Sequence, residues 1–245
     1  MGTRACDRRR ALPRDLTESV ALSGPTPGRD LTSGSPARAA LDSALEEWRS
    51  ATTDVPNIID GREVRTGDTF PIVVPHSHAT RLGQVHRAGT AVTTAAVDAA
   101  LAAARKWGAA RSSCPAAPFR EAAQMLEVGP WRDRLVAAVM LEMSKTADQA
   151  DGDAACETVD LLRAALTNAA AVGRVQPTSP NGVPNHLEYR PLEGFVLAIS
   201  PFNCASMNHL AFGPALLGNI GVETGGKHRV GLPSRAPTAA RSGAA

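Results

Sequence analysis

The residue best placed to do chemistry in this sequence is Asn203. It follows residues 195–199, an unbroken apolar run that is bounded by Gly194 and Pro201. This pattern predicts a strand that is buried on both faces, as in a parallel sheet. Open α/β sheets bind ligands just beyond the carboxyl ends of such strands, so the Asn203 amide could donate a hydrogen bond to a ligand there. Taken alone, an asparagine in this place is more often a turn residue or a helix cap.

Other polar groups give weaker signals. Cys204 adjoins Asn203, but no base lies near it in the sequence, so we expect a small buried thiol rather than a nucleophile. His76 and His78 have no third ligand beside them and are expected to be a loop pair. The Ser-Lys-Thr run at 144–146 lacks a preceding glycine-rich loop, which favours a helix surface over a phosphate site. We therefore predict no metal site.

The elements that must position Asn203 form an α/β pattern. Ser35 followed by Pro36 predicts a helix start, and Asp60-Gly61 predicts a type I′ turn in a hairpin over 58–64. Thr94 is expected to cap a helix over 95–107. Further helices are predicted at 36–48, 119–126, 131–147, 153–172 and 205–217, and further strands at 71–74, 83–87 and 186–190.

The ends of the chain differ in character from this central part. Residues 1–33 are rich in arginine, contain acidic residues and include no apolar core segment, which favours a disordered leader over a targeting sequence. Residues 220–245 have no apolar periodicity and are expected to be a disordered tail. Residues 34–219 then form the one folded part.

Composition excludes several classes of function. The 245 residues have a formal net charge of +2, and no apolar run approaches the length of a membrane-spanning helix. We therefore expect neither nucleic-acid binding nor membrane insertion. The four cysteines show no metal-ligand spacing and no disulfide framework, which fits a reducing, cytoplasmic setting.

Several separated stretches together resemble the aldehyde dehydrogenase superfamily, and within it the L-glutamate γ-semialdehyde (Δ1-pyrroline-5-carboxylate) dehydrogenases. The resemblance runs from about residue 34 to Asn219 and has its segments in the family's order. The matching stretches are residues 34–36, 97–103, 129–132, 144–146, 153–157, 189–195, 200–203 and 215–219. The fold that this implies is an incomplete Rossmann-like NAD-binding domain with amino-terminal helices, a β-hairpin and the start of an oligomerisation arm.

The resemblance implies oxidation of an aldehyde, L-glutamate γ-semialdehyde, to glutamate with NAD in proline degradation. Asn203 matches the family asparagine whose amide donates to the oxyanion of the tetrahedral intermediate. The matched segment that lines the nicotinamide of the cofactor consists of Ile199, Ser200, Pro201 and Phe202. Glu157 matches a helix glutamate near the family's substrate channel.

The sequence departs from the family after Asn219. The family continues into a strand ending in Trp-Lys-Pro-Ser, whereas this chain has Val222-Glu223-Thr224. These three residues can be encoded GTG-GAA-ACC, which reads Trp-Lys-Pro when it is shifted by one base. We therefore hypothesise a frameshift near Ile220. The family's catalytic cysteine and glutamate base lie further along, so we expect this chain alone to be inactive.

The sequence is compatible with three functions. The first is a semialdehyde dehydrogenase by descent, present as an amino-terminal fragment. The second is a non-catalytic truncated paralogue that pairs with a full-length subunit, or with itself, through the arm around residues 186–190. The third is a non-functional gene remnant, since an incomplete parallel sheet exposes an unpaired edge and favours aggregation.

Overall fold

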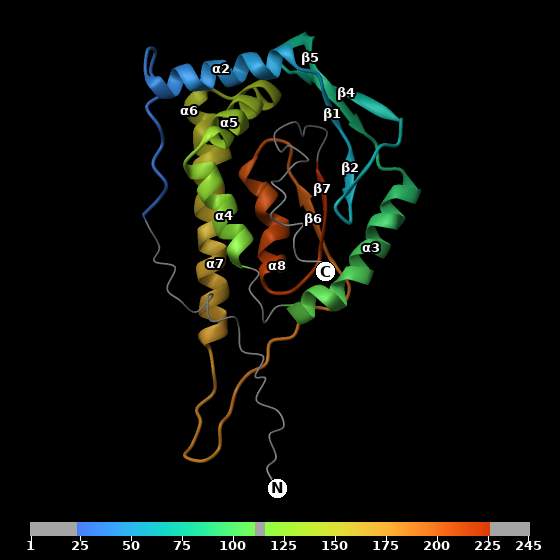
Figure 1. Cartoon of the computed structure of the whole chain (residues 1–245), viewed down its shortest axis with the longest axis vertical. Helices are drawn as coiled ribbons and strands as arrows, with labels where there is room; N and C mark the ends of the chain where they lie inside the picture. Colours follow the sequence, from blue (N-terminus) through green and yellow to red (C-terminus); the bar gives the residue numbers. More distant parts are fainter. Residues whose placement is uncertain (1–23, 111–115, 226–245) are drawn as a thin grey trace.

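The structure is a computed structural model that describes residues 24–110 and 116–225. Figure 1 shows α4 (Ala116–Glu127), α5 (Pro130–Met143) and α7 (Thr158–Arg174) on one side of the molecule, and α3 (Thr90–Ala110) on the other. Between them lie α8 (Phe212–Leu216) and the strands β6 (Val196–Ser200) and β7 (Gly221–Gly225). The mixed α/β class predicted from the sequence is confirmed.

The first helix, α2 (Pro36–Ser50), forms where the sequence predicts it. The Ser35 hydroxyl accepts a hydrogen bond from the Arg38 N–H, and Pro36 occupies the first turn. The buried face consists of Leu41, Ala44, Leu45 and Trp48. Trp48 also donates its indole N–H to the Arg134 carbonyl oxygen at 2.9 Å, which joins α2 to α5.

Five short strands follow α2. β2 (Asn57–Ile59) and β3 (Arg62–Val64) form the predicted hairpin, with positive φ angles of 50° at Asp60 and 70° at Gly61, as a type I′ turn requires. The other strands form a sheet in the order β1 (Thr53–Val55), β5 (Ser77–His86), β4 (Thr69–Val74). A Cβ on Gly83 would lie 2.0 Å from the Thr53 carbonyl oxygen, so the parallel pairing of β1 with β5 requires glycine there.

Several helix limits differ from those predicted. α3 begins at Thr90, so Thr94 lies inside the helix rather than capping it. α4 begins at Ala116 and accommodates Pro118 in its first turn, where a missing N–H costs no hydrogen bond. α5 ends at Met143 because Ser144 adopts a left-handed conformation with a φ of 56°.

The helix predicted from residue 153 begins earlier and is not regular. α6 (Ala147–Ala150) starts with a capping box between Thr146 and Gln149, and it continues into η2 (Asp151–Glu157). η2 is a π-helical segment, and α7 follows it directly. π-helical turns are rare and are frequently found at functional sites.

Residues 24–33 do not match the predicted disordered leader. The main-chain N–H and the hydroxyl of Thr26 both donate to the Asp160 carboxylate, at 2.9 and 2.6 Å. Arg29 donates to Asp151, and Leu31 joins the core with 7% of its surface exposed. Polar contacts with α7 and η2 order this segment. Its order could therefore not be recognised from apolar periodicity. Residues 1–23 of the predicted leader lie outside the described residues.

The strand predicted at 195–200 is confirmed as β6, but its predicted burial is wrong. β6 pairs in parallel with β7, and the two form a two-stranded sheet among the described residues. Ala198 and Ser200 are buried, whereas Leu197 is 54% exposed and Ile199 67% exposed. One face of the strand is therefore uncovered in this structure.

Two further predictions are corrected, one for residues 221–225 and one for residues 186–190. Residues 221–225, placed in a disordered tail, form β7 because their backbone groups pair with β6 from Val196 to Ser200. Residues 226–245 lie outside the described residues. The strand predicted at 186–190 is not found; this stretch belongs to an exposed connection, in which Tyr189 donates its hydroxyl to the Val175 carbonyl oxygen.

A buried ion pair joins two helices, and a further hydrogen bond from its arginine reaches the amino-terminal segment. Arg132 of α5 donates to both carboxylate oxygens of Asp151, at 2.8 and 2.7 Å, and their side chains are 5% and 3% exposed. Arg132 also donates to the Pro27 carbonyl oxygen. No helix within residues 24–110 and 116–225 combines the length and the apolar composition needed to cross a bilayer.

We predict that Asp151→Ala lowers the free energy of unfolding by about 3–5 kcal/mol, because it leaves the Arg132 guanidinium buried without its main counter-charge. Urea denaturation followed by circular dichroism measures the change. The matched control is Asp42→Ala, which breaks an exposed pair between Asp42 and Arg38 on α2 and should cost less than about 0.5 kcal/mol. Equal losses in the two variants would contradict the prediction.

A second polar cluster surrounds Asp54, on β1 of the three-stranded sheet. Asp54 accepts hydrogen bonds from Gln84 and from Arg65, each at 2.8 Å, and His86 lies 3.2 Å from it. The Gln84 and Arg65 hydrogen bonds lower the pKa of Asp54 to about 2. The folded pKa lies below the usual value, so the ionised carboxylate stabilises the fold above about pH 4, and this contribution is lost as the pH falls through about 2.

We predict that the Asp54 side-chain carbon titrates with a midpoint of about 2 in a carbon-13 NMR titration of the folded chain. Gln84→Ala should raise this midpoint, because it removes the largest stabilising hydrogen bond to the carboxylate. A midpoint at the ordinary value of 3.8 in the unmodified chain would show that these hydrogen bonds do not form.

Candidate active site

The carboxyl end of β6 presents the residues that the sequence singled out. Ser200 is buried and donates its hydroxyl to Glu223 of β7 at 2.8 Å. Pro201, Phe202 and Asn203 follow in a turn and are exposed, with Phe202 at 67%. Asn203 is therefore exposed just beyond the carboxyl end of β6, as its position after a strand predicts.

The turn after Asn203 is bound to the π-helical segment through Asp153. The two carboxylate oxygens of Asp153 accept the main-chain N–H groups of Ala205 at 3.0 Å and of Ser206 at 3.3 Å. The Cys204 thiol donates to the same carboxylate at 3.1 Å. Lys145 completes the set, with its ammonium 2.5 Å from Asp153 Oδ2.

Charge and hydrogen bonding keep Asp153 ionised although it is 7% exposed. Burial by itself would raise the pKa of this carboxyl group. The hydrogen bond from Lys145 and those from Ala205, Cys204 and Ser206 outweigh burial, so the pKa of Asp153 is held below its usual value of 3.8. Asp153 is thus an acceptor of hydrogen bonds at neutral pH.

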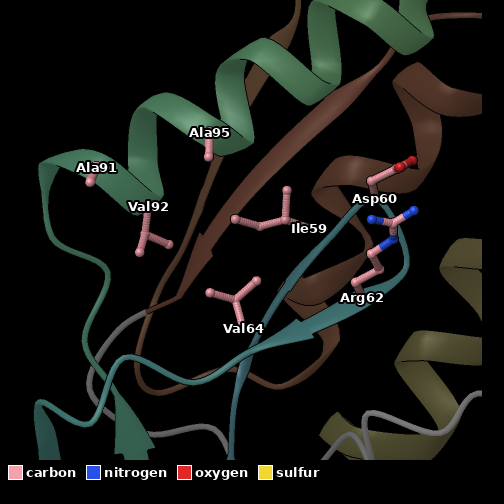
Figure 2. Close-up of a pocket in the computed structure, with 7 residues that line it drawn as sticks. All are labelled: Ile59, Asp60, Arg62, Val64, Ala91, Val92 and Ala95. Atoms are coloured by element: carbon pink, nitrogen blue, oxygen red, sulfur yellow. The ribbon is translucent and has the colours of Figure 1, made fainter.

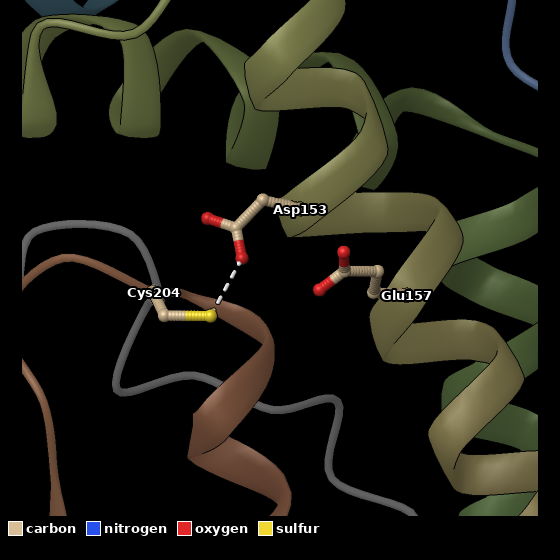
Figure 3. Close-up of side chains that lie close together, drawn as sticks. All are labelled: Asp153, Glu157 and Cys204. Atoms are coloured by element: carbon tan, nitrogen blue, oxygen red, sulfur yellow. Dashed lines mark hydrogen bonds between the residues drawn. The ribbon is translucent and has the colours of Figure 1, made fainter.

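Glu157 contacts the same turn from one turn further along the helix. Its carboxylate accepts the Ser206 hydroxyl at 2.9 Å. Figure 3 shows Asp153 and Glu157 both directed from their helix toward Cys204. The resemblance placed Glu157 near a substrate channel, and in the structure Glu157 contacts Ser206, three residues after Asn203.

One group of potential metal ligands occurs among the described residues. Ligand atoms of Asp153, Glu157 and Cys204 lie within 4.8 Å of one another. Lys145 already supplies a positive charge to Asp153, and Ser206 donates to Glu157, so the carboxylates are satisfied by protein donors. Cys204 is half-buried, and its thiol donates to a carboxylate.

Sequence reasoning missed Asp153 and Lys145 as parts of this site. Asp153 begins the matched stretch 153–157, but only Glu157 received a role. Lys145 was expected on a helix surface, whereas it lies in the short connection between α5 and α6 and points to Asp153. The His76 ring, expected in a loop, contacts the Ser144 hydroxyl at 2.8 Å.

A separate pocket lies between the β2–β3 hairpin and α3, away from these residues. Figure 2 shows Ile59 and Val64 of the hairpin facing Val92 and Ala95 of α3. Asp60 and Arg62 are the charged side chains in its lining. None of the predicted site residues lines it, so the carboxyl end of β6 remains the candidate site.

Comparison with known proteins identifies the family of the chain. A model of the aldehyde dehydrogenase family matches residues 63–222, which is more than half of the sequence. The chain belongs to the aldehyde dehydrogenase family. The resemblance found in the sequence is thereby confirmed, including the incomplete Rossmann-like domain that it implies.

The relatives share one name. The mitochondrial Δ1-pyrroline-5-carboxylate dehydrogenase of Mus musculus is 39% identical over 188 residues, covering 76% of this chain and 33% of that protein. The Δ1-pyrroline-5-carboxylate dehydrogenase of Agaricus bisporus is 40% identical over 192 residues, covering 76% of this chain and 35% of that protein. The chain spans about a third of the length of the curated relatives it matches.

A solved structure agrees with these matches. The Δ-pyrroline-5-carboxylate dehydrogenase from Mycobacterium tuberculosis bound with NAD superposes with a TM-score of 0.79 at 38% identity. The match covers 85% of this chain and 39% of that one. The described fold is therefore that of the corresponding part of an aldehyde dehydrogenase.

Proposed function

We propose that this chain supplies the oxyanion-binding side of an NAD-dependent dehydrogenase that oxidises L-glutamate γ-semialdehyde to glutamate. The observation that supports this most directly is the exposed Asn203 at the carboxyl end of β6, in a chain 37–40% identical to several Δ1-pyrroline-5-carboxylate dehydrogenases. The aldehyde in equilibrium with pyrroline-5-carboxylate would be the small-molecule substrate.

The proposed reaction begins with attack of a thiolate on the aldehyde carbon. A carbon–sulfur bond forms, and the carbonyl electron pair moves to oxygen, which becomes an oxyanion. The Asn203 side-chain N–H would donate to that oxygen and stabilise the charge as it develops. The oxyanion then reforms the carbonyl as hydride leaves the carbon, and water hydrolyses the resulting thioester to the acid and the free thiol. We propose that the thiolate and the base come from a segment outside these 245 residues.

The residues at the end of β6 fit the nicotinamide side of a cofactor site. Ile199 and Phe202 present exposed apolar surface, each 67% exposed, next to the backbone of Ser200 and Pro201. A flat aromatic ring can pack on such a surface, as nicotinamide would when NAD is bound. NAD would accept the hydride in this position.

We further propose a cytoplasmic location. Within the described part of the chain, Cys156 and Cys204 are free thiols, as expected in a reducing compartment. The relatives include mitochondrial enzymes, so localisation of a tagged chain in its native cell is the direct measurement.

We predict that the purified chain produces no NADH from pyrroline-5-carboxylate and NAD, because Asn203 alone provides neither nucleophile nor base. Absorbance of NADH is the measurement, and a complete Δ1-pyrroline-5-carboxylate dehydrogenase is the positive control. Turnover by the chain alone would overturn the proposal that the thiolate and the base come from a segment outside it.

The same assay tests Asn203 when the missing part is supplied. The chain is mixed with the carboxy-terminal part of a Δ1-pyrroline-5-carboxylate dehydrogenase that begins after the segment matching Asn219. If turnover is recovered, Asn203→Ala should lower kcat by about 10²–10³-fold, the loss seen when one oxyanion donor is removed. Asn185→Ala changes an exposed loop asparagine and should leave kcat unchanged. Equal activity of the Asn203 variant and the unmodified chain would refute the role of Asn203.

A second candidate function is non-catalytic pairing with a full-length subunit. The observation that favours it is the uncovered face of β6, where Leu197 and Ile199 are exposed at 54% and 67%. Parallel strands are normally covered on both faces, so this surface favours association. The exposed connection that contains Val183 and Leu187 adds further apolar surface.

We predict that the tagged chain co-purifies with a full-length Δ1-pyrroline-5-carboxylate dehydrogenase, and that the double variant Leu197→Asp, Ile199→Asp abolishes this. The exposed positions should tolerate aspartate without loss of fold, which circular dichroism checks. Val128→Asp, at a residue 73% exposed just after the end of α4, is the matched control and should not affect pairing. An insoluble chain, or pairing that survives the double variant, would count against this function.

A further inference from the structure

The backbone immediately after Asn203 has an unusual set of hydrogen-bond partners. The main-chain N–H groups of Ala205 and Ser206 lie at the start of η3 (Ser206–Ala211), a short 3₁₀-helix. The first N–H groups of a helix have no partner within it and need an outside acceptor. Both N–H groups here are buried and donate to one carboxylate, that of Asp153.

Asp153 reaches this turn from a part of the chain that is remote in sequence. It lies about fifty residues earlier, on η2, and its side chain is 8% exposed. A carboxylate at this depth is costly unless it is paired and hydrogen-bonded. Lys145 provides the opposite charge, and Glu157 accepts the Ser206 hydroxyl from the same helix. Two carboxylates of η2 therefore contact the turn through its backbone and through Ser206.

We propose that Asp153 is a positioning residue that holds the backbone of the turn carrying Asn203 through the main-chain N–H groups of Ala205 and Ser206. The proposal rests on the proposed function for the chemical role of Asn203. Asn203 is exposed and follows the exposed Pro201 and Phe202, so packing around its own side chain does not define its position. The first buried backbone after it is that of Ala205 and Ser206, which are 6% and 0% exposed.

The geometry separates this role from a general contribution to stability. Asp151 lies two residues earlier on η2, is also buried, and contacts other partners, Arg132 and Arg29. Replacement of Asp151 weakens the fold without removing a partner of the turn. Replacement of Asp153 removes the acceptors of the turn. The two aspartates therefore form a matched pair for experiment.

The experiment is nitrogen-15 NMR of the full chain carrying Asp153→Asn or Asp151→Asn. Asparagine is close in shape to aspartate, but its NH₂ group donates where Asp153 accepts. With Asp153→Asn we expect the Ala205 and Ser206 amide protons to shift upfield and to exchange with solvent about 10- to 100-fold faster, as loss of hydrogen bonds to a charged acceptor implies. The Asn203 backbone amide signal should move toward its value in an unstructured peptide.

Asp151→Asn should leave the Ala205, Ser206 and Asn203 signals unchanged. Unchanged Ala205, Ser206 and Asn203 signals in Asp153→Asn would overturn the proposal. Equal changes in both variants would overturn it as well, because they would mean a loss of stability and not of position.

A milder variant keeps the proposal testable if Asp153→Asn does not fold. Lys145→Gln removes the positive charge beside Asp153 but keeps the carboxylate, and Lys145 is partly exposed. The charged and titratable groups that face Asp153 are Lys145, Cys204 and Glu157. Loss of the lysine charge should raise the pH at which Asp153 takes up a proton.

In Lys145→Gln the Ala205 and Ser206 amide shifts should therefore titrate together, with a midpoint at higher pH than in the unmodified chain. Amide shifts that do not follow the protonation of Asp153 would refute the proposed contact. Neither NMR measurement depends on turnover. Failure of the proposed function would appear in the reconstituted assay of Asn203→Ala, and failure of the positioning role would appear here.

Discussion

The fold depends on the buried ion pair between Arg132 and Asp151. Desolvation of two charges is costly, and the interior offsets this cost only where further hydrogen bonds satisfy both groups. Here Arg132 donates to both oxygens of Asp151 and to the Pro27 carbonyl oxygen, and Arg29 adds a second guanidinium. The pair therefore joins α5, η2 and the amino-terminal segment at one point. The next aspartate of η2, Asp153, contacts a different partner, the turn after β6.

This arrangement explains why a polar helix segment lies next to the candidate site. A regular helix in the core would present apolar residues on that side, but η2 has buried carboxylates at Asp151 and Asp153. Each carboxylate is matched by a cation on a neighbouring segment, Arg132 or Lys145. The helix is thus held by charge pairs on two sides, and Ala154 and Ala155 of η2 pack in the core. Such a segment can order a loop that has few apolar residues of its own.

The sequence predicted those features that are set by a few adjacent residues. Ser35 with Pro36 started a helix, and Asp60 with Gly61 closed a hairpin, because both signals act over a single turn of chain. β6 was also predicted, but its burial was not, since burial depends on what covers the strand. The order of residues 24–33 was missed because Thr26 and Arg29 are ordered by carboxylates more than a hundred residues away. Asp153 was missed for the same reason: its partners, Lys145 aside, lie beyond β6. The frameshift hypothesis stays a prediction; residues 221–225, which it assigns to a shifted reading frame, pair with β6 as a strand.

The exposure of the candidate site and the proposed inactivity of the chain have one physical cause. An amide donor stabilises an oxyanion strongly only where water is excluded, because water competes for the same charge and raises the local dielectric constant. Asn203, Phe202 and Ile199 are all exposed here, as is Leu197 of β6. The surface that would pair with more protein is therefore also the surface that must be covered before Asn203 can act. Positioning by Asp153 and coverage of β6 are separate requirements: the contacts of Asp153 with the turn are present in this structure, whereas Leu197 and Ile199 are uncovered.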